Sequence, residues 1–143
     1  MAETEGKFRL LVIPKDVIRL SQQEPSVQLR MQNRSSDRQA FKVKCTDNGL
    51  FGIQPSVGVL DPREWTTVEL TYRGDETHIL SAHTHYFGLY HIPAPEGAMA
   101  RSVWQEHCGP PIGIRRIYVE PHHKVDVTDD SVDSAASSTT VYL

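Results

Sequence analysis

Residues 38–62 read RQAFKVKCTDNGLFGIQPSVGVLDP, and this stretch predicts a strand, a turn and a corner around which the chain is organised. Phe41, Val43 and Cys45 alternate with polar residues near its start. Because successive side chains of a strand point to opposite faces, these three residues are expected to face a hydrophobic core. The sequence therefore predicts a half-buried strand over residues 39–46.

Lys42 and Lys44 occupy the other face of this strand and are expected to point into water. Two strand residues rise about 7 Å, so both ammonium groups lie close enough to bind one acidic partner. The alternative is that the lysines only keep an outer strand soluble and discourage pairing of its edge. Both interpretations place the two lysines on the exposed face of a sheet.

Other short apolar segments follow along the chain, separated by turn residues. Pro14 is expected to split the first strand into two pieces on different sheets. About seven strands with almost no helix predict an all-β antiparallel β-sandwich. The expected strand segments are residues 8–14 and 16–20, which are the two pieces of the split first strand, followed by 26–33, 39–46, 50–55, 65–72, 83–92 and 112–120. Residues 57–60 are apolar, and the expected helical turns lie within 96–105.

The last two of these segments carry more specific expectations. Phe87, Leu89 and His91 are expected on one face of the first of them. In the final segment, Arg115 and Arg116 interrupt the apolar alternation, which predicts a β-bulge at that point.

The 143 residues are expected to form one domain with flexible ends. Residues 1–7 read as a flexible N-terminus, residues 8–121 as the sandwich and residues 122–143 as a disordered tail rich in Ser, Thr and Asp. The sandwich region is neutral in formal charge. The tail carries the net charge of −3, from one lysine and four aspartates: Lys124, Asp126, Asp129, Asp130 and Asp133.

Two roles are open for this tail. Its Ser and Thr residues between 128 and 140 are candidate phosphorylation sites, and each phosphate adds nearly two negative charges. Alternatively, the tail only solubilises the domain. Its last residues, Val141, Tyr142 and Leu143, also suit a strand that adds to the sheet edge of a partner.

Composition argues against several classes of protein. A neutral domain lacks the broad positive field that nucleic-acid binding requires. The longest aliphatic run, Leu10 to Ile13, is far shorter than the roughly 20 residues that cross a bilayer. The acidic first residues contain no apolar segment typical of a signal peptide, so an intracellular protein is expected, with Cys45 and Cys108 as free thiols.

The histidines and cysteines form no recognisable catalytic or metal-binding pattern. His83 and His85 share one strand face, but a zinc site needs about four converging ligands. Cys45 is expected inward and Cys108 precedes a Gly-Pro-Pro break, so neither is placed beside a base. No metal, cofactor or catalytic site is therefore expected.

Three segments resemble the major sperm protein (MSP) domain family, and together they cover residues 8–121. The resemblance implies a seven-stranded immunoglobulin-like sandwich, and the third segment is more similar to the nematode sperm branch than to the VAMP-associated branch. The segments are the basic strand 41–46 with 53–55 and the Gly58 to Pro62 corner, the split strand at Ile13-Pro14, and the run from Pro95 through Trp104 to Arg116.

The sperm branch implies a cytoskeletal protein without catalytic activity, either a filament subunit or an accessory protein that modulates filament assembly in crawling sperm. The acidic tail favours the accessory interpretation, because it would protrude from a packed polymer and repel neighbouring subunits. The expected partners are MSP-domain proteins, either a second copy in a homodimer or filament-forming MSP in a hetero-oligomer. The expected location is the cytoplasm and the cytoskeleton of the sperm pseudopod.

The VAMP-associated branch implies the alternative function, an adaptor that binds acidic peptides containing two phenylalanines. Its peptide site corresponds here to Lys42, Lys44 and Thr46, while a lysine and a methionine of that site correspond to Tyr86 and Gly88. Losing a cation and an apolar anchor is expected to weaken acidic-peptide binding. These five residues form the candidate partner-binding site.

Overall fold

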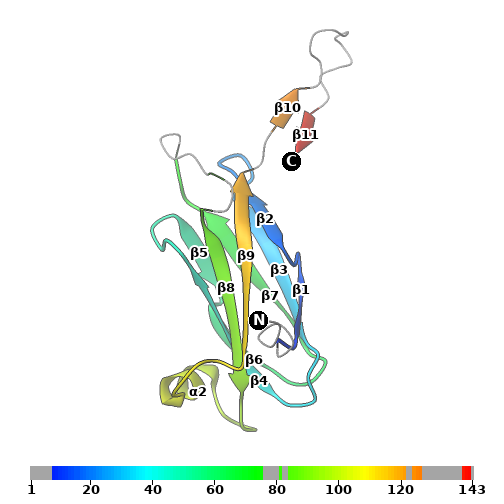
Figure 1. The fold of residues 1–143 in the computed structure, drawn as a ribbon, viewed down its shortest axis with the longest axis vertical. Coiled ribbons are helices and arrows are strands. Elements are labelled where there is room, and N and C mark those ends of the chain that lie inside the picture. The colour runs from blue at the N-terminus through cyan, green and yellow to red at the C-terminus, as the bar shows by residue number, and fades with distance from the viewer. Residues whose placement is uncertain (1–7, 76–80, 82–83, 122–123, 127–139, 143) are drawn as a thin grey trace.

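The computed structural model describes residues 8–75, 81, 84–121, 124–126 and 140–142 (Figure 1). Two sheets pack face to face, and the predicted immunoglobulin-like all-β sandwich is confirmed. One sheet has the order β1 (Leu10–Ile13), β3 (Ser26–Asn33), β7 (Trp65–Tyr72) and β5 (Phe51–Gln54). The other has the order β2 (Val17–Leu20), β9 (Gly113–Pro121), β8 (Tyr86–Pro93), β4 (Gln39–Cys45) and β6 (Val57–Leu60).

The core lies between the inner faces of the two sheets, as the two-residue alternation predicted. In β3, Leu29 and Met31 are fully buried while Gln28 and Arg30 are exposed. In β4, Phe41 and Val43 are buried and Cys45 packs against the same core from a partly buried position. From β8, the core receives Phe87, Leu89 and His91, which confirms the shared face expected for them.

The first strand is split at Pro14, as predicted. β1 pairs with β3 in one sheet, and β2 pairs with β9 in the other. The second pairing is parallel, although the sequence predicted an antiparallel sandwich throughout. The difference arises because the chain passes from one sheet to the other without a hairpin that would reverse its direction.

The predicted bulge at Arg115 and Arg116 is wrong. β9 pairs with β8 in continuous register from Gly113 to Tyr118, and its side chains keep alternating. Arg115 takes an inward position at the rim of the core, where its guanidinium carbon lies 4.7 Å from the centre of the Phe8 ring. A cation over an aromatic ring replaces the aliphatic residue that the pattern lacked.

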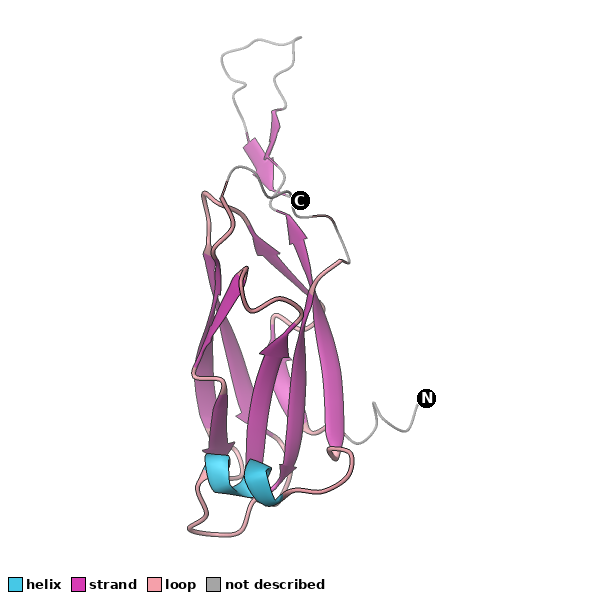
Figure 2. Ribbon diagram, turned by 90° about the vertical axis from the view of Figure 1, so that its left-hand side faces the viewer, coloured by secondary structure: helices cyan, strands magenta, loops and turns pink. Residues whose placement is uncertain are grey.

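A short helix and a small pair of strands lie at opposite ends of the sandwich (Figure 2). Helix α2 (Ala100–Glu106) confirms the helical turns expected in this region. In the tail, which the sequence predicted to be disordered, β10 (Lys124–Asp126) pairs antiparallel with β11 (Thr140–Tyr142). Val141 and Tyr142, which suited a strand added to a partner, thus pair within the chain. The other tail residues and residues 1–7 lie outside the described residues, so disorder there stays a prediction.

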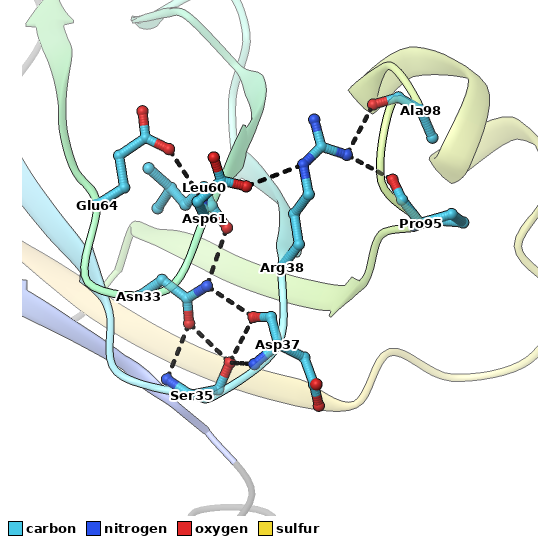
Figure 3. A network of polar contacts seen from close by, with 9 residues as sticks. All are labelled: Asn33, Ser35, Asp37, Arg38, Leu60, Asp61, Glu64, Pro95 and Ala98. Atoms are coloured by element: carbon cyan, nitrogen blue, oxygen red, sulfur yellow. Dashed lines mark hydrogen bonds and ion pairs between the residues drawn. The ribbon is translucent and has the colours of Figure 1, made fainter.

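Asn33 ties together the corner at the end of the opening stretch (Figure 3). Its side chain is fully buried, and its amide nitrogen donates to the carbonyls of Leu60 (2.9 Å) and Asp37 (2.8 Å). Its amide oxygen accepts from the backbone nitrogen (2.9 Å) and hydroxyl (2.7 Å) of Ser35. Both polar atoms of the Asn33 side chain are thereby hydrogen-bonded inside the protein.

Arg38 links the same corner to the segment that precedes α2. Its side chain contacts the Asp61 carboxylate at 3.2 Å and donates to the carbonyls of Pro95 and Ala98 at 2.6 and 3.0 Å (Figure 3). The corner is therefore held by its own polar network.

His91 is the one fully buried ionisable side chain among the described residues. Its Nε2 accepts a hydrogen bond from the Arg9 backbone nitrogen (3.0 Å), so the proton of the neutral ring sits on Nδ1, 2.9 Å from the Gln39 side-chain oxygen. Burial, followed by the nearby Arg9 charge, lowers the pKa of His91 to about 4. Gly113 packs directly on the ring and leaves no room for a side chain.

Candidate functional site

The outer face of the five-stranded sheet gathers basic and aromatic side chains from three adjacent strands. β4 pairs with β8 and β8 pairs with β9, so Lys44 lies opposite Gly88, which lies opposite Arg116. Two residues further along these two strands, Lys42 lies opposite Tyr90. We call this surface the basic–aromatic face and define it by Lys42, Lys44, Tyr86, Tyr90, Arg116 and Tyr118.

Each cation of the basic–aromatic face lies over an aromatic ring. The Lys44 ammonium is 5.9 Å from the centre of Tyr90, and the Arg116 guanidinium carbon is 4.4 Å from the centre of Tyr86. Tyr86 makes an edge contact with Tyr118, with ring centres 5.5 Å apart. The Tyr118 hydroxyl and then Tyr86 raise the pKa of Arg116, so this cation is stabilised in its charged form.

Lys42 sits nearer to helix α2. Its ammonium lies 4.7 Å from the centre of the Trp104 ring, whose Nε1 donates to the Phe41 carbonyl at 3.1 Å. The helix therefore covers the outer face on the Lys42 side. The open part of the face extends from Lys44 toward Arg116 and Tyr118.

The five residues proposed from sequence lie side by side along β4 and β8, where the Thr46 backbone nitrogen donates to the Tyr86 carbonyl at 3.3 Å. Lys42 and Lys44 point outward as expected, and Gly88 lies directly beside Lys44. The Thr46 hydroxyl is engaged with His85 Nδ1 at 2.7 Å. Tyr86 belongs to the basic–aromatic face, where its ring lies under Arg116. The residue that stands in place of the lysine therefore contributes a contact of its own.

Sequence reasoning missed Tyr90, Arg116 and Tyr118. A β-carbon at Gly88 would lie 2.6 Å from the Tyr90 hydroxyl, so the glycine lets this ring lie across the strand where the resemblance placed a methionine. Arg116 supplies a cation beside the position of the lost lysine. Alternation in β8 and β9 could have placed these residues outward, but their register could not be read from the sequence.

The described residues contain no group of three or more His, Cys, Asp or Glu side chains that could hold a metal ion. His85 contacts Thr46, while His83 lies outside the described residues. The Cys45 thiol donates to the Asn48 side-chain oxygen at 3.1 Å, and burial raises the pKa of Cys45, which disfavours a reactive thiolate. In the described part of the chain, no helix is long and apolar enough to cross a membrane.

A sequence model described as the MSP (Major sperm protein) domain matches residues 9–108 of this chain. The chain belongs to this family. The MSP-domain resemblance read from the sequence is thus confirmed, and the family is generally non-catalytic.

Two Caenorhabditis elegans proteins are similar to this MSP-domain chain, the uncharacterized proteins ZC262.1 and R05D3.5. Each is 30% identical over 79 residues, or 55% of this chain. The matched region spans 60% of the first protein and 44% of the second, so the chain accounts for only about half the length of these relatives.

Solved structures share the fold of the MSP domain at low sequence identity. The C. elegans MSP-domain protein SSP-19 has a TM-score of 0.62 at 18% identity, covering 77% of this chain and 96% of its own. The C. elegans MSP family member WR4 has a TM-score of 0.65 at 15% identity, covering 80% and 98%. The YadV chaperone has a TM-score of 0.58 at 13% identity, covering 82% and 54%.

Proposed function

We propose that this protein is a non-catalytic accessory of the MSP cytoskeleton in nematode sperm, which tunes filament assembly by binding other MSP-domain proteins through the basic–aromatic face. The observation that carries the proposal is the contact of Lys44 and Arg116 with aromatic rings, while the ion pairs among the described residues involve neither cation. A ring leaves the charge of a cation unneutralised, so both groups keep their attraction for an acidic partner.

The chemistry of the face suits a protein partner. Tyrosine, tryptophan and arginine are the side chains that most often dominate the binding energy of protein interfaces. On β9 the nearest carboxylate of the same face, Glu120, contacts Arg19 at 3.3 Å and lies beyond Tyr118. The open part of the face therefore presents a positive, aromatic surface to its surroundings.

The acidic tail supports an accessory role over that of a filament subunit. Its net charge of −3 would repel the tails of neighbouring copies in a packed polymer. A protein that binds individual filament subunits does not bring several of its tails together, so this repulsion does not arise. We place this activity in the cytoplasm, at the cytoskeleton of the sperm pseudopod.

Co-sedimentation with filament-forming MSP tests the proposal. We expect the purified protein to stay in the supernatant alone and to change the amount of MSP that pellets. The double variant Lys44→Glu/Arg116→Glu is expected to lose this effect, because both cations of the open face are reversed. The matched control is Arg30→Glu, which reverses a cation lying 4.6 Å from the Trp65 ring on the opposite sheet.

Two results would contradict the accessory role. Pelleting of the protein alone would identify a filament subunit instead. An unchanged MSP pellet would remove the cytoskeletal role and favour an adaptor.

The adaptor for acidic peptides containing two phenylalanines is the second candidate, and one observation favours it. Arg116 and Tyr90 restore a cation and an apolar surface beside Tyr86 and Gly88, where the resemblance implied a loss. For an adaptor we expect micromolar binding of such a peptide by isothermal titration. Lys44→Glu is expected to weaken it at least about tenfold, as for a charge at the centre of an interface. Millimolar or absent binding would rule this candidate out.

A further inference from the structure

We propose that the acidic tail of this chain, residues 122–143, docks on the basic–aromatic face of the same molecule and competes there with acidic partners. This inference rests on the proposed function, because both use the basic–aromatic face. It names the segment that regulates binding at that face. Its occupant is a segment of this chain, because the length, starting point and charge of that segment all fit the face.

The tail begins next to the face. β9 carries Arg116 and Tyr118 on its outer side and ends at Pro121, only three residues beyond Tyr118. At about 3.3 Å per residue, the tail starts about 10 Å from the Tyr118 position. Figure 1 shows β10 continuing from the end of β9, at the end of the sandwich opposite to α2.

The tail is long enough to cover the face. The distance from β9 across β8 to β4 is two strand spacings, or roughly 10 Å. Three or four extended residues span that distance, whereas the tail has 22 residues from His122 to Leu143. The length of the extended tail therefore suffices to cross the face.

The charges of tail and face are complementary. The tail holds four aspartates against Lys124, and these are the acidic groups that give the chain its net charge of −3. On the face, Lys44 and Arg116 contact aromatic rings, and no carboxylate of the described residues forms an ion pair with either, so an acidic segment can approach both cations. The acidic tail and an acidic partner would use the same two cations.

Tethering makes this contact effective even if it is weak. A short linker gives the attached segment an effective concentration of about 1 mM. A segment that binds with a dissociation constant of about 0.1 mM would then occupy the face about ten times more often than not. The apparent affinity for a competing acidic peptide falls by the same factor of about ten.

The test neutralises the tail in the full-length chain by Asp126→Asn, Asp129→Asn, Asp130→Asn and Asp133→Asn together. Backbone amide resonances of Lys44, Tyr90 and Arg116 are expected to shift between the two proteins, and the differences should vanish in about 0.5 M salt, where charges are screened within about 5 Å. Titration with the acidic two-phenylalanine peptide should show about tenfold tighter binding to the neutralised variant. Glu96→Gln, an exposed carboxylate near α2, is the control and should change neither readout.

The outcomes separate this inference from the proposed function. Identical resonances on the face in both proteins would overturn tail docking, whatever the peptide does. Shift differences that grow with protein concentration would also overturn it, because the tail would then be binding a second copy. Absence of peptide binding by both proteins would remove the adaptor candidate alone, since the resonance comparison needs no peptide.

Discussion

Asn33→Ala is expected to lower the free energy of unfolding by about 3 kcal/mol and the melting temperature by roughly 10 °C. The buried Asn33 amide makes four hydrogen bonds, and alanine makes none of them. The Leu60 carbonyl loses its partner in a buried position, where an unsatisfied group costs about 1–3 kcal/mol. The Asp37 and Ser35 groups lie nearer to solvent and regain part of their loss from water.

Gln32→Ala is the matched control for this prediction. Gln32 is the neighbour of Asn33 on β3 and points to the opposite face, where its side chain donates one exposed hydrogen bond to the Arg63 carbonyl at 3.0 Å. We expect it to cost below about 1 kcal/mol. Urea unfolding of the three proteins decides the matter: equal losses for both variants would mean that the Asn33 network adds nothing to a simple surface contact.

The Asn33 network also shows which kind of contact could not be predicted from the sequence. The alternation in β3 and β4 predicted which side chains are buried, because burial follows the two-residue period of a strand. From the sequence, Asn33 is only the last residue of the expected strand 26–33. Its decisive partner, Leu60, lies 27 residues away, and no local pattern encodes that contact.

The residues of the candidate site likewise differ in whether they could be predicted from the sequence. Lys42 and Lys44 could be placed on an outer face from a single strand. Arg116 comes beside Lys44 only through the successive registers of β4 with β8 and of β8 with β9. The same argument explains why Arg115 suggested a bulge, since its ring contact with Phe8 depends on a segment more than 100 residues away.

The pH dependence of stability is expected to depend on His91. Burial, followed by Arg9, lowers its pKa to about 4 in the folded protein, against about 6.5 in an unfolded chain. Protonation would give Nε2 a hydrogen facing the Arg9 N–H, so the folded state resists it. Because the unfolded chain then binds the extra proton, stability is full above about pH 6.5 and falls as the pH drops toward 4.

Lowering the pH from 7.5 to 5.0 is expected to remove about 2 kcal/mol of stability through His91 alone, out of about 3 kcal/mol by pH 4. His91→Gln keeps a donor toward Gln39 and an acceptor toward Arg9 without a titrating ring, so it isolates this contribution from those of the other histidines. Urea unfolding of both proteins at the two pH values measures the difference directly. If the variant loses as much stability on acidification as the natural protein, another group controls the pH dependence and His91 is already protonated or exposed in the folded state.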